Sequence, residues 1–289
     1  MRLGDRAFVA LQYLLPKHAI TALVYRLARA RTRWLKRALI RGFMRLYAIE
    51  LGDAAEPDAE GYASFNEFFT RALKDGARPL AAAAGAIASP CDGTVSERGT
   101  LDGERLLQAR LAAKNRWYTL GELLGEAPAA VAFVGGEFAT IYLAPYNYHR
   151  VHAPLGGRLT ALRYLPGELF SVNRATAAAV PRLFARNERV VCRFEGESGP
   201  WALVFVGALN VGSIEIAGVG ELTPARPRHV RSVPLPAAGL AFARGAELGR
   251  FNMGSTVILL LPRGSCRWSE RCVPGAVLRM GEAIAVVGG

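Results

Sequence analysis

The sequence predicts an α+β protein, with N-terminal amphipathic helices followed by a mostly antiparallel β domain resembling a sandwich or barrel. Apolar residues recur at helical spacing through the first 50 residues, whereas short β-type runs punctuated by Gly and Pro begin near residue 87. Hydrophobic residues form 51% and charged residues 21% of the 289 residues, which supports a buried core and excludes a disordered or collagen-like chain. We expect a helical segment over residues 1–60 and a β-rich domain over residues 61–289.

Three helices are expected in the first 50 residues. Pro16 separates the first helix from the second because proline cannot continue a helix. The apolar residues of the second follow the i, i+3, i+4, i+7 spacing of one helix face: Ile20, Leu23, Val24 and Leu27. The third is expected over about Trp34 to Ile49. Each helix therefore carries an apolar stripe beside basic residues.

The positive charge of the protein is concentrated in this segment. Residues 1–50 hold eleven Lys and Arg against two acidic residues, which is +9 of the total net charge of +12. Such a segment suits an anionic membrane surface. A nucleic-acid partner is not expected because no binding module is recognisable. The alternative is a helical cap packed on the rest of the protein.

The N-terminal segment is expected to associate peripherally with the cytoplasmic face of the cell membrane. Its longest uncharged run has ten residues, from Ala7 to Pro16, whereas a spanning helix needs about 20 apolar residues. Basic residues continue through the apolar runs and no cleavage site of small residues follows, so no secretory signal is expected. Four cysteines without CxxC pairing predict free thiols in a reducing compartment.

The remainder of the chain predicts a linker, one short helix and a series of strands. Leu51 to Gly61 is acidic and turn-rich, and Phe65 to Leu73 suits a short helix. The clearest predicted strands are residues 139–143, 190–194, 201–206, 213–216, 256–261 and 283–287. Neither a GxGxxG loop nor a Walker loop is present, so nucleotide binding has no support.

Two of the four histidines, His149 and His152, lie three residues apart directly after a predicted strand. Paired histidines in a turn can serve only as hydrogen-bonding residues, or they can act as proton carriers in a reaction. The HxxH spacing can also ligate zinc, but no further Cys, Glu or His cluster completes a zinc pattern. We therefore expect no metal site.

Asp92 and Ser255 are two further candidates, each within a pattern that also has a structural interpretation. Asp92-Gly93 is typical of a tight turn, yet a carboxylate at a strand end can also orient an imidazole. Gly254-Ser255 before an apolar strand is typical of a turn or bulge. Alternatively, the serine Oγ attacks the preceding carbonyl, and glycine tolerates the strained backbone that this needs.

Taken together, these patterns resemble one family along nearly the whole chain. The matching stretches are residues 11–16 (LQYLLP), 65–69 (FNEFF), 92–93 (DG), 148–152 (YHRVH), 166–173 (PGELFSVN), 184–189 (FARNER), 211–215 (VGSIE) and 254–256 (GST). In this order they resemble the proteobacterial type of phosphatidylserine decarboxylase. Met253 stands where that family usually has leucine, a volume-conserving exchange.

The resemblance implies a chain that cleaves itself between Gly254 and Ser255. It places Asp92, His152 and Ser255 as the maturation triad, in which Asp92 orients His152 and His152 takes the Ser255 proton. The products would be a β chain of residues 1–254 and an α chain of residues 255–289 that begins with a covalent pyruvoyl group derived from Ser255. This cofactor would form a Schiff base with the serine amine of phosphatidylserine, release CO₂ and yield phosphatidylethanolamine. By motif position, His149 would protonate the carbanion.

Two other interpretations remain open at this point. One is a catalytically inactive, membrane-associated β domain, which the intact Asp92, His149, His152 and Ser255 argue against. The other is a pyruvoyl decarboxylase of a soluble amino acid, which the basic helices disfavour. The expected partners are phosphatidylserine, an anionic membrane surface and the two chains of one precursor; a homo-oligomer is left open.

Overall fold

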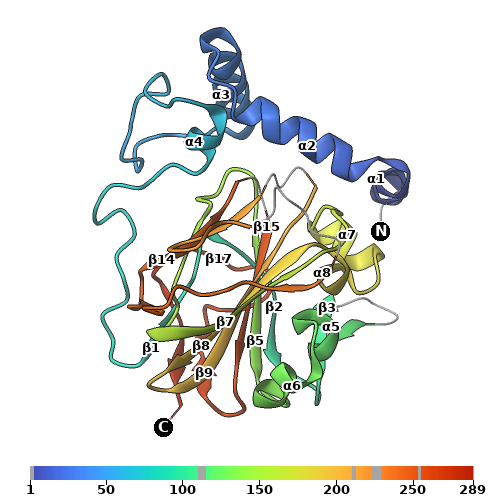
Figure 1. Cartoon of the computed structure of the whole chain (residues 1–289), viewed down its shortest axis with the longest axis vertical. Helices are drawn as coiled ribbons and strands as arrows, with labels where there is room; N and C mark the ends of the chain where they lie inside the picture. The colour runs from blue at the N-terminus through green and yellow to red at the C-terminus, as the bar shows by residue number, and fades with distance from the viewer. Residues whose placement is uncertain (1–2, 110–114, 210–212, 223–228, 253–254, 289) are drawn as a thin grey trace.

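The computed structural model describes residues 3–109, 115–209, 213–222, 229–252 and 255–288. The N-terminal helices lie across one end of a β-rich body, and the C-terminus lies at the opposite end (Figure 1). The predicted α+β class, with N-terminal helices and a mostly antiparallel β domain, is confirmed.

The three predicted N-terminal helices are present as α1 (Leu3–Leu14), α2 (Lys17–Ala28) and α3 (Arg33–Tyr47). Pro16 stands between α1 and α2, as expected. In the part of the chain that the structure describes, no single helix has the length and apolarity to cross a membrane. The α1–α2 pair meets those criteria only jointly, with an 89° bend at the break.

The protein covers the apolar stripe of α2 only in part, with Ile20 and Val24 half-buried. Leu23 and Leu27 are exposed, whereas Lys17, Thr21 and Ala28 are buried against the body. The large exposed apolar side chains of α1 and α3 are Phe8, Leu11, Tyr13, Leu14, Trp34 and Leu46. Val9 of α1 joins the main core, but α1 and α2 otherwise contact the body largely through polar and small residues and leave large apolar side chains outside.

Polar contacts fasten these helices to the body. The Gln12 side chain accepts a hydrogen bond from the Ser171 backbone at 2.7 Å and donates to Thr176. Lys17 pairs with Glu168 at 3.1 Å. Arg29, at the C-terminal end of α2, forms an ion pair with Glu221.

The short helix α4 (Phe65–Phe69) begins at a Ser64 cap and packs under α3. It ends four residues earlier than predicted, because the chain then pairs with the linker: Leu73 bridges Ala54. A small core joins both sides of this region: Ala28, Ile40, Leu51, Ala54, Tyr62, Phe65, Phe68 and Phe69. Helix α4 therefore shares its core with α3.

The main sheet is antiparallel and runs in the order β12-β7-β8-β9-β15-β5-β2-β17, with β13 also paired to β7. Its strands are β2 (Gly93–Thr100), β5 (Glu137–Leu143), β7 (Gly157–Leu165), β8 (Arg189–Gly196), β9 (Gly199–Val206), β12 (Arg231–Ser232), β13 (Leu240–Phe242), β15 (Ser255–Leu261) and β17 (Val277–Leu278). β15 lies within the sheet, and all seven of its residues are buried.

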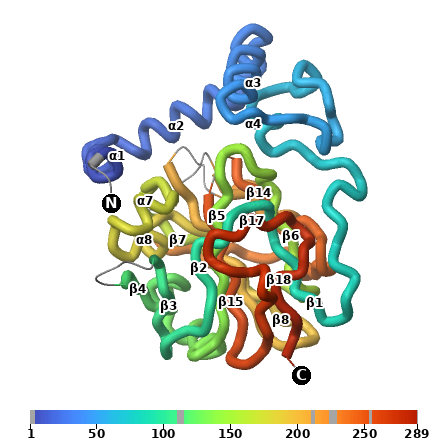
Figure 2. Tube along the Cα trace, turned by 180° about the vertical axis from the view of Figure 1, so that it is seen from behind, coloured from blue at the N-terminus to red at the C-terminus, as the bar shows by residue number. Residues whose placement is uncertain are grey.

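Three smaller sheets complete the body, and Figure 2 shows them from behind. Their strands are β6 (Arg150–His152), β10 (Ile214–Ile216), β11 (Gly220–Glu221) and β14 (Glu247–Phe251) in the first; β1 (Ala86–Ala88), β16 (Cys266–Trp268) and β18 (Ala283–Val287) in the second; and β3 (Arg105–Ala109) with β4 (Arg116–Thr119) in the third. The short helices are α5 (Leu120–Leu124), α6 (Ala127–Ala130), the 3₁₀ turn η1 (Val131–Phe133), α7 (Arg174–Ala179) and α8 (Leu183–Arg186). The six strands predicted from the sequence are all confirmed.

Candidate active site

Ser255 is the first residue of β15 and is fully buried. It lies opposite Leu143 of β5, so neighbouring strands hold its backbone. Its Oγ has no hydrogen-bond partner among the described residues. A buried hydroxyl is normally paired, and an unpaired one in a native structure points to a reactive or ligand-binding role. Gly254, the other side of the predicted cleavage site, lies outside the described residues.

His149 is fully buried, and its ring packs on Phe69 of α4 with centroids 4.0 Å apart. Its Nδ1 lies 2.7 Å from the Asn147 carbonyl oxygen, which can only accept, so Nδ1 carries the proton. Nε2 then carries a lone pair and no proton, and it has no hydrogen-bond partner among the described residues. Burial, with a smaller contribution from the Arg71 charge, lowers the pKa of His149 to about 3, so the ring is neutral at pH 7.

Strand register brings His149 close to the segment that leads to Ser255. The Phe251 amide at the end of β14 donates to the His149 carbonyl at 3.1 Å. Ser255 follows four residues later and faces Leu143, where the loop to His149 begins. The segment 144–149 joins β5 to β6, which pair with β15 and β14, so Phe251 and Ser255 lie at the same end of these strands as that segment. Among the described residues, the Nε2 of His149 and the Oγ of Ser255 are both unpaired there.

The carboxylate of Asp92 binds Arg78, a residue that was not expected from the sequence. Arg78 Nε and Nη2 contact both carboxylate oxygens of Asp92 at 2.7–3.2 Å, and Arg78 Nη1 pairs with Asp53 at 2.8 Å. The backbone amide of Met280 donates to Asp92 at 2.8 Å. Asp92 therefore joins the N-terminal part of the chain to the segment beyond Ser255.

His152 does not share a hydrogen bond with Asp92, contrary to the expectation that Asp92 orients its ring. Its Nδ1 donates to the Gly245 carbonyl at 2.8 Å, and the Tyr148 hydroxyl lies 3.0 Å from Nε2. Burial raises the pKa of Tyr148 to about 12, so this hydroxyl stays protonated and donates. Asp92 is close enough to oppose, by its charge, the lowering of the His152 pKa by burial. Asp92 is engaged by Arg78 instead, because a bidentate guanidinium is the stronger partner.

A polar cluster holds Asn252, two residues before Gly254. The side-chain amide nitrogen of Asn252 donates to Ser213 and to Glu221. Its side-chain oxygen Oδ1 accepts a hydrogen bond from Asn66 of the FNEFF motif at 3.1 Å. Glu221 also accepts from Arg29 of α2. The segment before the predicted cleavage site is therefore tied to both α2 and α4.

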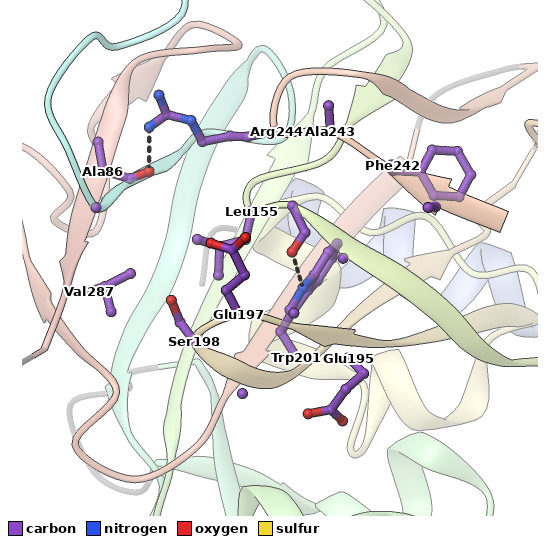
Figure 3. A pocket seen from close by; sticks show the side chains of 16 residues that line it. Ala86, Leu155, Glu195, Glu197, Ser198, Trp201, Phe242, Ala243, Arg244 and Val287 are labelled. Atoms are coloured by element: carbon purple, nitrogen blue, oxygen red, sulfur yellow. Dashed lines mark hydrogen bonds between the residues drawn. The ribbon is translucent and has the colours of Figure 1, made fainter.

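Two hollows among the described residues differ in their relation to the predicted site. The larger, about 630 Å³, is lined by residues such as Glu195, Trp201 and Arg244 and contains none of the predicted site residues (Figure 3). The smaller, about 210 Å³, is lined by Asp92, Arg78 and Arg71, and by residues of the loop before His149. The smaller one belongs to the site.

Asp92, His149, His152 and Ser255 were expected from the sequence, whereas Arg71, Arg78 and Asn252 were not. The structure brings His149 and the start of β15 to the same end of paired strands and keeps Asp92 and His152 near each other without a hydrogen bond. Arg71 follows the matched FNEFF stretch after one intervening residue, Thr70. A basic residue close to that motif was therefore the available signal.

Comparison with known proteins gives a consistent result. A family model described as phosphatidylserine decarboxylase matches residues 65–286, and one described as PSD matches residues 7–48. The phosphatidylserine decarboxylase proenzyme of Saccharophagus degradans is 46% identical over 282 residues, which cover 97% of each chain. That of Pseudomonas entomophila is 48% identical over 286 residues, 98% of each chain. That of Pseudomonas aeruginosa is 46% identical over 290 residues, 99% of each chain.

Proposed function

This chain belongs to the phosphatidylserine decarboxylase family, and on that premise we propose that it converts phosphatidylserine to phosphatidylethanolamine with a pyruvoyl group made from its own Ser255. The observation that carries the proposal is the buried, unpartnered Oγ of Ser255 at the start of β15. The relatives' names describe proenzymes, which fits a chain that must be processed.

The proposed maturation uses only groups of the chain and one water molecule. Ser255 Oγ attacks the Gly254 carbonyl carbon, and the amide becomes an ester. Loss of the Ser255 α-proton then breaks the Cβ–Oγ bond, leaving a Gly254 carboxylate and a dehydroalanine at position 255. Water converts the dehydroalanine to pyruvoyl and ammonia. His152 accepts the Ser255 proton in this proposal, which requires its Nε2 to exchange Tyr148 for the serine hydroxyl.

The residues around Ser255 fit the group that would form there. The Nε2 of His149 is a proton acceptor that has no competing partner among the described residues, and it lies in the segment that leads into β6. When present, the pyruvoyl carbonyl supplies an electron sink for the bond to CO₂. His149 Nε2 takes up a proton as the substrate amine becomes neutral and returns it to the carbon that CO₂ leaves. Phe69 covers the ring and excludes water from it.

The N-terminal helices are proposed to hold the protein peripherally on the cytoplasmic face of the cell membrane. Their exposed leucines, tyrosine and tryptophan and their +9 charge support insertion at an anionic lipid surface. The substrate is itself an anionic lipid. The same surface therefore would deliver it to the site beneath α3 and α4.

Intact-mass analysis tests the proposed function. We expect the purified protein to contain two chains, the smaller (residues 255–289) of about 4 kDa, blocked at its N-terminus. Ser255→Ala should remain one chain and release no CO₂ from phosphatidylserine, because no hydroxyl can attack. Thr256→Ala is the matched control, since it removes the neighbouring buried hydroxyl, and it should be cleaved. A full-length wild-type chain that decarboxylates phosphatidylserine would contradict the proposal.

A further inference from the structure

The 210 Å³ cavity beside His149 contains a charged side chain that the reaction described above does not use. It lies between the C-terminal end of α3 and the loop from β5 to β6, with Tyr47 on one side and Asn147 and Tyr148 on the other. Arg71 and Arg78 both line it. The question is what each guanidinium binds.

Arg71 is buried without a carboxylate partner. It is 8% exposed, and no carboxylate lies within 4.0 Å of it in the part of the chain that the structure describes. Its one hydrogen bond among these residues is a long one, 3.4 Å from Nη1 to the Phe68 carbonyl. A guanidinium has five N–H donors in a planar fork, so most of its donors are available to the cavity. Burial accordingly lowers the pKa of Arg71.

Arg78, unlike Arg71, has carboxylate partners. Its guanidinium is saturated by Asp92 and Asp53, and those two carboxylates are in turn engaged by it. The groups close enough to influence Arg71 electrostatically are Asp92, Arg78, Tyr62 and Tyr148. Among the described residues that line the cavity, Arg71 is thus the cation with available donors.

The cavity is adjacent to the proposed chemistry. Asn147 lines the cavity, and its backbone carbonyl accepts a hydrogen bond from Nδ1 of His149. The Arg71 charge is close enough to lower the pKa of that histidine. On its other side the cavity is closed by residues 47–50, at the end of α3, whose outer face carries exposed apolar side chains. The cavity therefore lies between the end of the helix with the exposed apolar side chains and the segment that carries His149.

We propose that Arg71 binds the phosphodiester of the phospholipid headgroup in this cavity. The inference rests on the proposed function, because it assumes a phospholipid substrate. A bidentate guanidinium fits two phosphate oxygens. The phosphodiester keeps its charge from substrate to product, whereas the carboxylate loses its charge as CO₂ leaves. A fixed cation on the carboxylate would stabilise the substrate more than the transition state and slow the reaction.

Steady-state kinetics on the processed enzyme, with short-chain phosphatidylserine in mixed micelles, tests this role. Arg71→Gln should raise KM about ten- to a hundredfold with kcat changed much less, because the contact is equal in substrate and transition state. Arg71→Lys should recover part of the loss. Lys74→Gln removes an exposed charge three residues along, bonded to the Gly52 carbonyl, and should change KM less than about twofold. A fall in kcat at unchanged KM for Arg71→Gln would overturn the proposal.

Calorimetry on the processed enzyme provides a second test, in which the comparison of ligands on the wild-type protein needs no variant. Glycerophosphoethanolamine should bind, ethanolamine without phosphate should bind far more weakly, and Arg71→Gln should lose the difference. Equal binding of the two by wild type would overturn the proposal. Inorganic phosphate that binds as tightly as glycerophosphoethanolamine would also overturn it, by showing a site for free phosphate. A wild-type enzyme that is inactive on phosphatidylserine would instead contradict the proposed function.

Discussion

Three polar side chains at the site lie in apolar or enclosed surroundings with unused hydrogen-bonding capacity. Ser255 Oγ and His149 Nε2 are unpaired among the described residues, and Arg71 has a single long hydrogen bond there. Each unpaired buried group costs on the order of 1–3 kcal/mol of stability. At these three positions the fold accepts this cost and leaves groups available for the proposed reaction.

The two histidines should be separable by substitution, since they differ in their partners. His152→Ala should run mostly as one uncut chain, because the base for a single-event cleavage is lost. His149→Ala should be cleaved while turnover falls by about 10²–10⁴-fold, the usual loss for a general acid or base. Gel analysis and CO₂ release measure both outcomes. The reverse pattern would assign the cleavage to His149, whose Nε2 is the unpaired one.

Among the elements, α1, α2 and α3 combine polar anchoring with exposed apolar side chains. Their contacts with the body use Gln12, Lys17 and Arg29, so the leucines outside are not needed to hold the helices in place. Leu14 is 83% exposed and Leu46 73% exposed. This arrangement favours a membrane-facing surface over the helical cap.

Substitution of these leucines should weaken membrane binding without unfolding the protein. The triple variant Leu14→Ser, Leu23→Ser, Leu46→Ser should lose at least about tenfold in partition to anionic vesicles, since burial of each leucine is worth about 1.5–3 kcal/mol. Vesicle co-sedimentation measures the partition, and added salt should weaken wild-type binding. Val131→Ser, an equally exposed apolar position on the body, is the control. Unchanged vesicle binding of the triple variant would show that the exposed leucines do not contribute to membrane binding and that the helices have only a structural role.

At the scale of the whole molecule, buried His149 makes stability depend on pH. Its pKa is about 3 in the folded protein and about 6.5 in the unfolded chain, so the unfolded chain binds more protons between these values. This contribution to stability is complete above pH 6.5 and is lost as the pH falls. Between pH 7 and pH 5 the loss should be about 2 kcal/mol.

Urea unfolding of the uncleaved Ser255→Ala protein, with and without His149→Gln, measures this contribution at pH 7 and pH 5. Glutamine does not titrate, so the second variant should lose about 2 kcal/mol less of its stability on acidification than the first. Equal losses in both proteins would mean that the pKa of His149 is the same in the folded and unfolded chain.

The sequence predicted the strands and most reacting groups because both depend on local patterns. Runs such as residues 256–261 are apolar and β-branched, and Ser255 and His149 lie in short motifs. The short helices α5 to α8 were missed because four to six residues show no periodicity. The Arg78–Asp92 pair, the isolation of Arg71 and the partial exposure of the α2 stripe depend on which distant segments meet. Local patterns carry no information on that.

The position of β15 has a consequence for the working life of each molecule. The strand that begins at Ser255 is hydrogen-bonded on both sides, to β5 and β9, and the segment after it is held through Met280 by Asp92. A C-terminal fragment produced by self-cleavage would therefore stay bound to the molecule that made it and could not be exchanged for another. If its reactive end were damaged, no fresh fragment could take its place. Lost activity would be restored only by synthesis of a new chain.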